Sequence, residues 1–193
     1  MTARLIYVVG ASGSGKDSLM SYARNRLANE SLVVFAHRYI TRAADAGGEN
    51  HVALTQEEFD SRRRAGLMAM HWESHGHAYG LGIEVNQWLA KGITVVVNGS
   101  REYLETAAQR YPELVPVWVE VSPEVLRARL QARGREGAEE IEKRLARAPK
   151  NQVLGRRGEL IRNDGELHLA GDTLVNLIRH GSGSGAVSCA SLS

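Results

Sequence analysis

Short apolar runs alternate with stretches of helical spacing along most of the chain. The runs that predict buried strands are Leu5–Val9, Leu32–Ala36, Ile93–Val97, Leu114–Val121 and the weaker Glu159–Arg162. Helices are predicted by apolar spacing or capping signals at 15–29, 84–90, 102–111, from Ser122 onward and at 172–179. Strands that alternate with helices indicate parallel βαβ units. The pattern therefore predicts an α/β fold with a parallel sheet of about five strands flanked by helices.

Residues 37–80 interrupt this alternation. The segment is rich in Gly, His and Arg, and we find no long strand in it. Its one clear helix begins after Thr55, where Glu58 stands at the third helical position, as in a capping box. We interpret 37–80 as an inserted acceptor-binding region.

The segment between the first strand and the first helix has the spacing of a Walker A phosphate loop. Glycines at 10, 13 and 15 let the backbone approach a polyphosphate, and Lys16 can reach its β- and γ-phosphates. A glycine-rich loop without a ligand is the weaker alternative. One position departs from the motif, because Asp17 stands where Ser or Thr usually holds Mg²⁺, and Ser18 follows it. We interpret Asp17 as a metal ligand or a catalytic base, with Ser18 as a second Mg²⁺ residue.

Composition narrows the class of protein. The 193 residues suit one domain, which we place at 1–180, and a formal net charge of +2 gives no reason to expect a nucleic-acid partner. One cysteine and no apolar run near 18 residues predict a cytoplasmic protein without a membrane span or signal peptide. Residues 181–193 predict a disordered tail, and the sequence leaves open a monomer or a homodimer.

Arginines crowd the segment from about 127 to 147, which we interpret as a lid. Small kinases close such a lid over the phosphates to neutralise the transferred group and exclude water. Arg133 and Arg144 are the candidates for catalysis, and a salt-bridged, solvated helix face with the neighbouring glutamates is the alternative. A GTPase is disfavoured because no Asn-Lys-x-Asp motif occurs.

The phosphate loop, inserted region and arginine lid together resemble guanylate-kinase-like P-loop kinases. Within that group, the chain resembles the ribose 1,5-bisphosphate phosphokinases of bacterial phosphonate catabolism in segments 13–18, 37–42, 48–51, 79–82 and 97–101. The resemblance implies that ATP and Mg²⁺ convert ribose 1,5-bisphosphate to 5-phosphoribosyl 1-diphosphate. The nucleotide-binding residues that we expect are Gly10, Ala11, Ser12, Gly13, Ser14, Gly15, Lys16, Asp17, Ser18, Arg133 and Asn163.

Two departures from guanylate kinases shape the expected acceptor site. The glutamate that reads guanine falls on Met70, whose thioether cannot accept two N–H bonds, so guanine recognition should be lost. The acidic residue after the third strand is replaced by Asn98. We expect a phosphorylated sugar to contact Arg38, Arg42, Tyr79, Asn98 and Ser100.

Several alternatives remain open. A nucleoside monophosphate kinase and a non-catalytic guanylate-kinase-like binding module are the rival functions. His71, His75 and His77 are interpreted as loop histidines rather than a zinc site, and Trp72, Trp88 and Trp118 as packing residues. Asn163 and Asp164 either form part of an adenine pocket or close an Asx turn.

Overall fold

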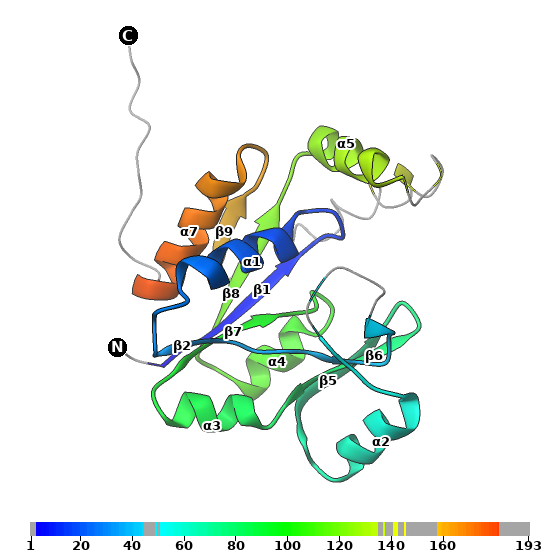
Figure 1. The fold of residues 1–193 in the computed structure, drawn as a ribbon, viewed down its shortest axis with the longest axis vertical. Helices are drawn as coiled ribbons and strands as arrows, with labels where there is room; N and C mark the ends of the chain where they lie inside the picture. The colour runs from blue at the N-terminus through cyan, green and yellow to red at the C-terminus, as the bar shows by residue number, and fades with distance from the viewer. Residues whose placement is uncertain are drawn as a thin grey trace.

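The computed structural model describes residues 3–44, 49, 51–134, 137, 141–142, 145 and 158–181 (Figure 1). The helices with assigned bounds are α1 (Lys16–Arg26), α2 (Gln56–Arg64), α3 (Glu84–Ala90), α4 (Leu104–Arg110), α5 (Pro123–Arg133) and α7 (Leu167–His180). Most of the predicted lid and the predicted tail beyond Gly181 lie outside the described residues. Within the described part, no helix is long and apolar enough to cross a membrane.

A five-stranded sheet forms the centre of the molecule. Its strands, in spatial order, are β2 (Val33–Phe35), β7 (Thr94–Asn98), β1 (Leu5–Gly10), β8 (Leu114–Glu120) and β9 (Glu159–Arg162). Every neighbouring pair is parallel. The predicted strands are confirmed, with ends that differ by at most one residue. The parallel α/β architecture places the carboxyl ends of β1 and β7 side by side, next to the phosphate loop.

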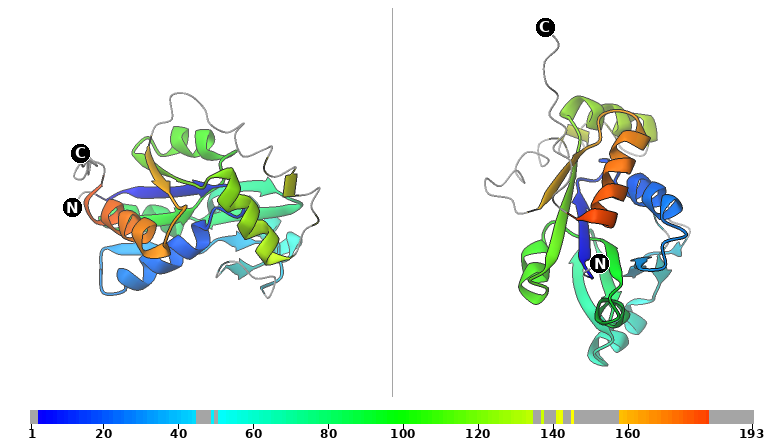
Figure 2. Two further views of the ribbon diagram at one scale, coloured as in Figure 1. Left: turned by 90° about the horizontal axis from the view of Figure 1, so that it is seen from above. Right: turned by 90° about the vertical axis from the view of Figure 1, so that its left-hand side faces the viewer.

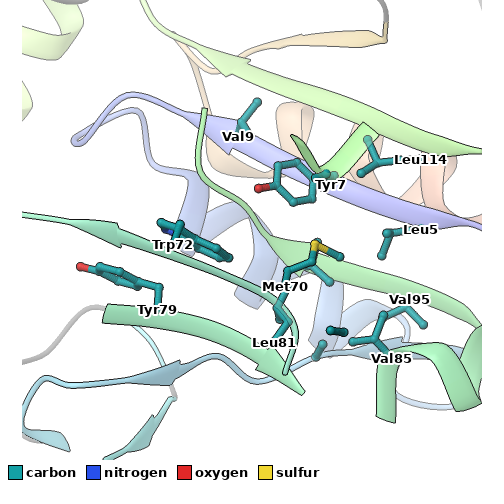
Figure 3. Packing of buried hydrophobic residues seen from close by; sticks show 14 of the residues in the cluster. Leu5, Tyr7, Val9, Met70, Trp72, Tyr79, Leu81, Val85, Val95 and Leu114 are labelled. Carbon is teal, nitrogen blue, oxygen red and sulfur yellow. The ribbon is translucent and has the colours of Figure 1, made fainter. Parts of the chain in front are cut away.

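Side chains of β1 alternate between two buried faces, as the two-residue period of a strand requires. Ile6 and Val8 pack with α1 and α7, which cover one face of the sheet (Figures 1 and 2). Leu5, Tyr7 and Val9 pack on the opposite face with α3, α4 and a second sheet (Figure 3). The core therefore lies on both faces of the central sheet. The second sheet, which belongs to the inserted region, packs on one of these faces.

The second sheet corrects our prediction that 37–80 contains no long strand. It consists of β4 (Val52–Ala53), β3 (Tyr39–Ile40), β6 (His77–Gly82) and β5 (Met68–Ser74) in that spatial order. β5 and β6 form an antiparallel hairpin. Its turn has φ of 50° at His75 and 75° at Gly76, a conformation for which Asn-Gly or Asp-Gly is the usual sequence signal. A histidine in the first of these positions concealed the hairpin.

Two helix boundaries show how local signals and packing compete. Thr55 caps α2 as predicted, since its Oγ1 accepts from the backbone N–H of Glu58 at 3.1 Å. The last helix was predicted from Asp172, but α7 begins at Leu167. Gly171 lies inside this helix, where a Cβ atom would collide with the ring of Tyr22 from α1. Close packing of α1 on α7 thus requires a glycine that local rules associate with a helix end.

Candidate active site

The loop between β1 and α1 has the backbone shape of a phosphate-binding loop. Gly13 and Gly15 have φ of 93° and 83°, the left-handed region that favours glycine. A Cβ atom on Gly15 would also collide with Nδ2 of Asn163. Gly15 immediately precedes α1, so the unpaired N–H groups of the first helical turn lie at the loop. An anion at this position can accept hydrogen bonds from them.

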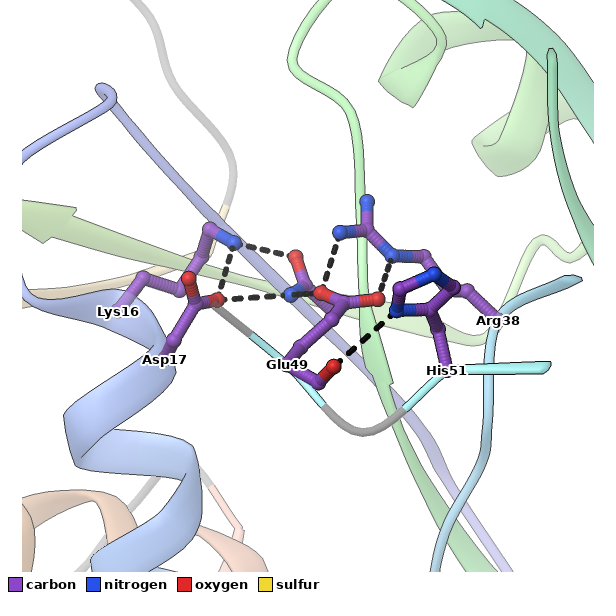
Figure 4. A network of polar contacts seen from close by, with 6 residues as sticks. Lys16, Asp17, Arg38, Glu49 and His51 are labelled. Atoms are coloured by element: carbon purple, nitrogen blue, oxygen red, sulfur yellow. Dashed lines mark hydrogen bonds and ion pairs between the residues drawn. The ribbon is translucent and has the colours of Figure 1, made fainter. Parts of the chain in front are cut away.

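Lys16 and Asp17 contact one buried amide, that of Asn98 at the end of β7 (Figure 4). The ammonium of Lys16 donates to Oδ1 of Asn98 and lies 3.3 Å from Oδ1 of Asp17. Nδ2 of Asn98 donates to the same carboxylate oxygen at 2.9 Å. Burial lowers the pKa of Lys16, and the Asp17 carboxylate opposes that shift. Asn98, which we predicted on the acceptor side, therefore also contacts the phosphate loop.

Arg38 is paired with Glu49, which was not among the predicted site residues. Nε of Arg38 donates to Oε1 of Glu49 at 2.6 Å, and Nη2 donates to Oε2. Only 13% of each side chain is exposed. Nδ2 of Asn98 also donates to Oε2 of Glu49. The contacts therefore run from Lys16 through Asn98 and Glu49 to Arg38. The sequence did contain a signal for Glu49, because this residue lies in segment 48–51, one of the segments that carry the family resemblance.

His51 holds the backbone around this ion pair. Its Nδ1 lies 3.1 Å from the carbonyl oxygen of Glu49 (Figure 4). Its Nε2 lies 3.1 Å from the carbonyl oxygen of Arg42. Carbonyl oxygens only accept, so both contacts are hydrogen bonds only when both ring nitrogens carry a proton. His51 thus connects the segment of Arg42 with the segment of Glu49.

A cavity of about 150 Å³ adjoins the network. One wall comes from α1 and the other from the segments around β2, β3 and β7. The lining residues are Asp17, Met20, Ser21, Arg24, Ala36, Arg38, Glu49 and Asn98. The cavity therefore brings together three predicted site residues that are far apart in the sequence.

The remaining predicted acceptor residues lie near this network. Tyr79 is buried, with its ring 5.0 Å from the guanidinium carbon of Arg38 and stacked on Trp72 at 5.8 Å between centroids. Trp72 belongs to the core cluster, which confirms its packing role. Of the other two, Arg42 contacts the ring of His51 through its carbonyl, and Ser100 contacts the hydroxyl of Tyr7 through its backbone.

Tyr7 fixes the turn that carries Ser100. Its hydroxyl donates to the carbonyl of Ser100 at 3.2 Å and accepts from the backbone N–H of Ser100 at 3.0 Å. A Cβ atom on Gly99 would collide with the tyrosine ring. Burial raises the pKa of Tyr7. A neutral phenol therefore positions the chain directly after Asn98.

Asn163 and Arg129 hold the outer side of the phosphate loop. The carbonyl of Ser14 accepts from Nδ2 of Asn163 at 2.7 Å and from Nη1 of Arg129 at 3.3 Å. Nη2 of Arg129 also donates to the carbonyl of Asn163 at 2.8 Å. Asp164 accepts from the backbone N–H of Ser122 at 2.6 Å. Sequence reasoning missed Arg129 because nothing in the arginine-rich run distinguished it from its neighbours.

The structure describes only some of the other arginines in the predicted lid. Arg133 is the last residue of α5, and Arg144 lies outside the described residues. Arg127 forms two hydrogen bonds of 3.1 Å with Glu142 on an exposed face. For Arg127 the salt-bridged interpretation is therefore confirmed.

Met70 lies in the core rather than in the cavity. Its side chain is fully buried on β5, among apolar residues of the central sheet and the second sheet (Figure 3). A buried thioether at this position offers no hydrogen-bonding carboxylate. Among the nearby histidines, His77 contacts the carbonyl of Thr41 at 2.8 Å, and His75 contacts Oγ of Ser74 at 2.8 Å.

The residues present fit a nucleotide with a hydrated divalent cation. The first turn of α1 offers backbone donors to phosphate oxygens, and the buried Oδ1 of Asn163 has no hydrogen-bond partner among the described residues. In the described ranges, no three His, Cys, Asp or Glu side chains form a metal site of their own. Mg²⁺ keeps several waters and is commonly bound by one or two carboxylates together with substrate phosphates. Asp17 fits that role, with Ser18 beside it.

Comparisons with known proteins agree with the α/β fold described above. Residues 6–150 match the model of the AAA domain family. The crystal structure of guanylate kinase from Anaplasma phagocytophilum has a TM-score of 0.64 to this chain and covers 92% of it, with 84% of that chain matched. Its sequence identity is 17%, so the likeness concerns the fold alone.

Curated relatives are much more similar. The ribose 1,5-bisphosphate phosphokinase PhnN of Thiobacillus denitrificans is 59% identical over 175 residues, which cover 91% of this chain and 92% of that protein. The protein of the same name from Desulfomicrobium baculatum is 57% identical, over 91% of this chain and 94% of its own length. The chain matches the AAA domain model and belongs to the ribose 1,5-bisphosphate phosphokinase family of P-loop kinases.

Proposed function

We propose that the protein transfers the γ-phosphoryl group of ATP to the 1-phosphate of ribose 1,5-bisphosphate, giving 5-phosphoribosyl 1-diphosphate and ADP. An oxygen of the 1-phosphate forms the new bond to the γ-phosphorus, and the bond from this phosphorus to the departing ADP oxygen breaks. One observation carries the proposal: a single cavity has Asp17 of the phosphate loop on one wall and Arg38 on the other. The names of the curated relatives support the choice of sugar.

The reaction makes a modest demand on proton transfer. A phosphate monoester is already ionised near neutral pH, so its oxygen attacks with little help from a base. The residues must instead align the two phosphates and neutralise their charge. Lys16 and the N–H groups of the loop are placed to bind the β- and γ-phosphates of ATP. This role agrees with the position of Lys16 at the start of α1.

Arg38 and Arg42, with Tyr79, are assigned to the acceptor phosphate. Arg38 uses Nε and Nη2 for Glu49, which leaves Nη1 available to an acceptor oxygen. Glu49 therefore acts as a positioning residue that fixes the plane of the guanidinium. His51 supports it by contacting the carbonyl of Glu49. Asn98 and Ser100 are assigned to orienting the acceptor from the end of β7.

Asp17, with Ser18, is assigned to Mg²⁺. When bound, the ion neutralises charge on the phosphate oxygens of the nucleotide. The hydrogen bond from Asn98 to Oδ1 of Asp17 supports the assignment, because it holds the carboxylate at the loop rather than free in solvent. Oδ2 then remains for the ion or one of its waters.

The organisation of the chain follows the same scheme. We assign 1–180 to one kinase domain, with an acceptor-binding region at about 37–80 and a lid at about 127–147 whose Arg133 and Arg144 approach the phosphates. The bond from Arg129 of α5 to the carbonyl of Ser14 in the phosphate loop supports a lid next to the nucleotide. The proposal also includes that the protein acts in the cytoplasm as a monomer or a homodimer. It further includes a role in phosphonate catabolism.

The rival functions lack comparable support. A guanylate-type kinase needs polar groups for the guanine edge, and Met70 is a core residue. A non-catalytic binding module has no need for Lys16 to be held between Asn98 and Asp17. The names of the relatives also favour the phosphokinase.

The test measures ADP formation from ATP and Mg²⁺ with ribose 1,5-bisphosphate or GMP offered separately, and identifies the product by phosphorus NMR. We expect turnover with the sugar and a diphosphate signal from the product. Turnover with GMP alone would overturn the proposal in favour of a nucleotide kinase. Nucleotide binding without turnover of either acceptor would favour the binding module.

A further inference from the structure

Arg24 is a cation in the cavity wall to which no established role is attached. It lies two helical turns after Asp17 on α1, and both residues line the cavity, together with Met20 and Ser21. These positions are three, four and seven residues after Asp17, so they lie on one face of the helix. The cavity therefore has a carboxylate at the phosphate-loop end and a guanidinium at the other.

The guanidinium of Arg24 lies over an aromatic ring. Its Cζ lies 5.4 Å from the centre of the Phe35 ring, and Arg24 is half-buried. Among the residues that the structure describes, none forms an ion pair or side-chain hydrogen bond with it. A cation–π contact with an aromatic ring uses no N–H group as a hydrogen-bond donor to oxygen, so the guanidinium keeps N–H groups available to an oxyanion.

The other charges that line the cavity are already compensated. Arg38 and Glu49 pair with each other, and Asp17 pairs with Lys16. Within the part of the chain that the structure describes, Arg24 is therefore the charged residue of the cavity wall without an ion-pair partner, and it favours an anion at that end. The exposed hydroxyl of Ser21, one helical turn before Arg24, adds a hydrogen-bond donor beside it.

The distance along the helix suits a ligand with two separated phosphates. Seven residues of α-helix correspond to about 10 Å, and the arginine side chain can shorten this span. A phosphate that reacts near Asp17 thus leaves room for a sugar ring and a second phosphate toward Arg24. A nucleoside monophosphate would bring no charge to that end of the cavity.

We propose that Arg24, assisted by Ser21, binds the 5-phosphate of the acceptor and so selects a sugar bisphosphate over a monophosphate. This proposal rests on the proposed function, since it names the second anion of the same substrate. Arg24 is then a specificity residue that contacts the substrate away from the transferred group. The shared ligand chemistry is a phosphate group, which either the acceptor or ATP can supply.

The experiment compares two ligands on the unchanged chain and on three variants. Calorimetric titration, with a non-hydrolysable ATP analogue and Mg²⁺ present, gives Kd for ribose 1,5-bisphosphate and for ribose 1-phosphate. The variants are Arg24→Ala, Arg24→Lys and Arg26→Ala. Arg26 is a matched control because it lies on the same helix, is 62% exposed on its side chain, and faces Asp172 at 4.0 Å instead of the cavity. Arg24→Lys adds a variant that keeps the charge without the planar fork.

We expect the unchanged chain to prefer the bisphosphate by about 10- to 100-fold, the range for a charge-assisted contact. Arg24→Ala should lose most of that preference by weakening only the bisphosphate, with Arg24→Lys intermediate and Arg26→Ala unchanged. Equal weakening of both ligands by Arg24→Ala, or an unchanged preference, would overturn the proposal.

Two further readouts separate the proposals. The Kd of the ATP analogue should be the same in Arg24→Ala as in the unchanged chain, and a rise would assign Arg24 to the nucleotide instead. Failure of the unchanged chain to bind or phosphorylate ribose 1,5-bisphosphate would contradict the proposed function itself. Thermal unfolding of each variant checks that Arg24→Ala remains folded.

Discussion

Nδ2 of Asn98 donates to Oδ1 of Asp17 at 2.9 Å, although the two residues are 81 positions apart in the sequence. Asn98 ends β7, and Asp17 lies in the first turn of α1. The same amide accepts from Lys16 through its oxygen. One neutral side chain thus sets the positions of both charged groups of the phosphate loop.

Asn98→Ala should therefore lower kcat/KM. The substitution removes the donor shared by Asp17 and Glu49 and the acceptor of Lys16. Because these hydrogen bonds involve charged groups, we expect their loss to lower kcat/KM by about 10- to 100-fold. Steady-state kinetics with ATP and ribose 1,5-bisphosphate measure the effect. Asn86→Ala is the control, because Asn86 accepts from Tyr111 on an exposed surface. Equal activity of the two variants would refute the role of Asn98.

Asp17→Asn should raise the concentration of free Mg²⁺ needed for half-maximal rate by about 10- to 100-fold, in the range seen when groups that support a metal site are removed. An amide keeps the size of the side chain but loses the negative charge that attracts the cation. The rate is measured against free Mg²⁺ at saturating ATP. Unchanged turnover and unchanged Mg²⁺ dependence would eliminate Asp17 as a metal residue.

Arg129→Ala should weaken ATP binding by about 10-fold or more, because the guanidinium bonds to the carbonyls of Ser14 and Asn163 would be lost. Binding of the non-hydrolysable analogue is measured by titration. Arg127→Ala provides the matched control on the same helix, since Arg127 forms an exposed pair with Glu142. An exposed pair contributes about 0 to 1 kcal/mol. A similar loss in both variants would point to general charge rather than loop positioning.

Tyr7→Phe should reduce the free energy of unfolding by about 1 to 3 kcal/mol at neutral pH, because the backbone N–H of Ser100 loses its acceptor. Urea unfolding of both proteins measures the difference.

The pH dependence of this difference has a definite sign. Burial raises the pKa of Tyr7 above its ordinary 10.0, so above about pH 10 the unfolded chain releases this proton while the folded chain retains it. The stabilisation from Tyr7 is therefore complete below pH 10 and declines above it. The gap between the unchanged protein and Tyr7→Phe should narrow over the same range. A gap that widens or stays constant would contradict this account of Tyr7.

Local patterns in the sequence were sufficient for the main sheet and the phosphate loop. The apolar runs that became β1, β7 and β8 can be identified without tertiary information, because burial on both faces requires continuous apolar residues. The glycine and lysine spacing of 10–16 likewise depends only on neighbouring residues. Thr55 and Ser122 mark helix starts for the same reason, since a cap acts within three positions.

Tertiary structure decided the features that depend on contacts between distant segments. The hairpin of β5 and β6 has a turn without the usual asparagine, and α7 extends through Gly171 because Tyr22 packs there. Glu49 and Arg129 join the site through Arg38 and Ser14, respectively. Which of many charged residues lies at a site is set by how the segments pack. The local sequence determines each element, and the long-range packing determines which side chains meet.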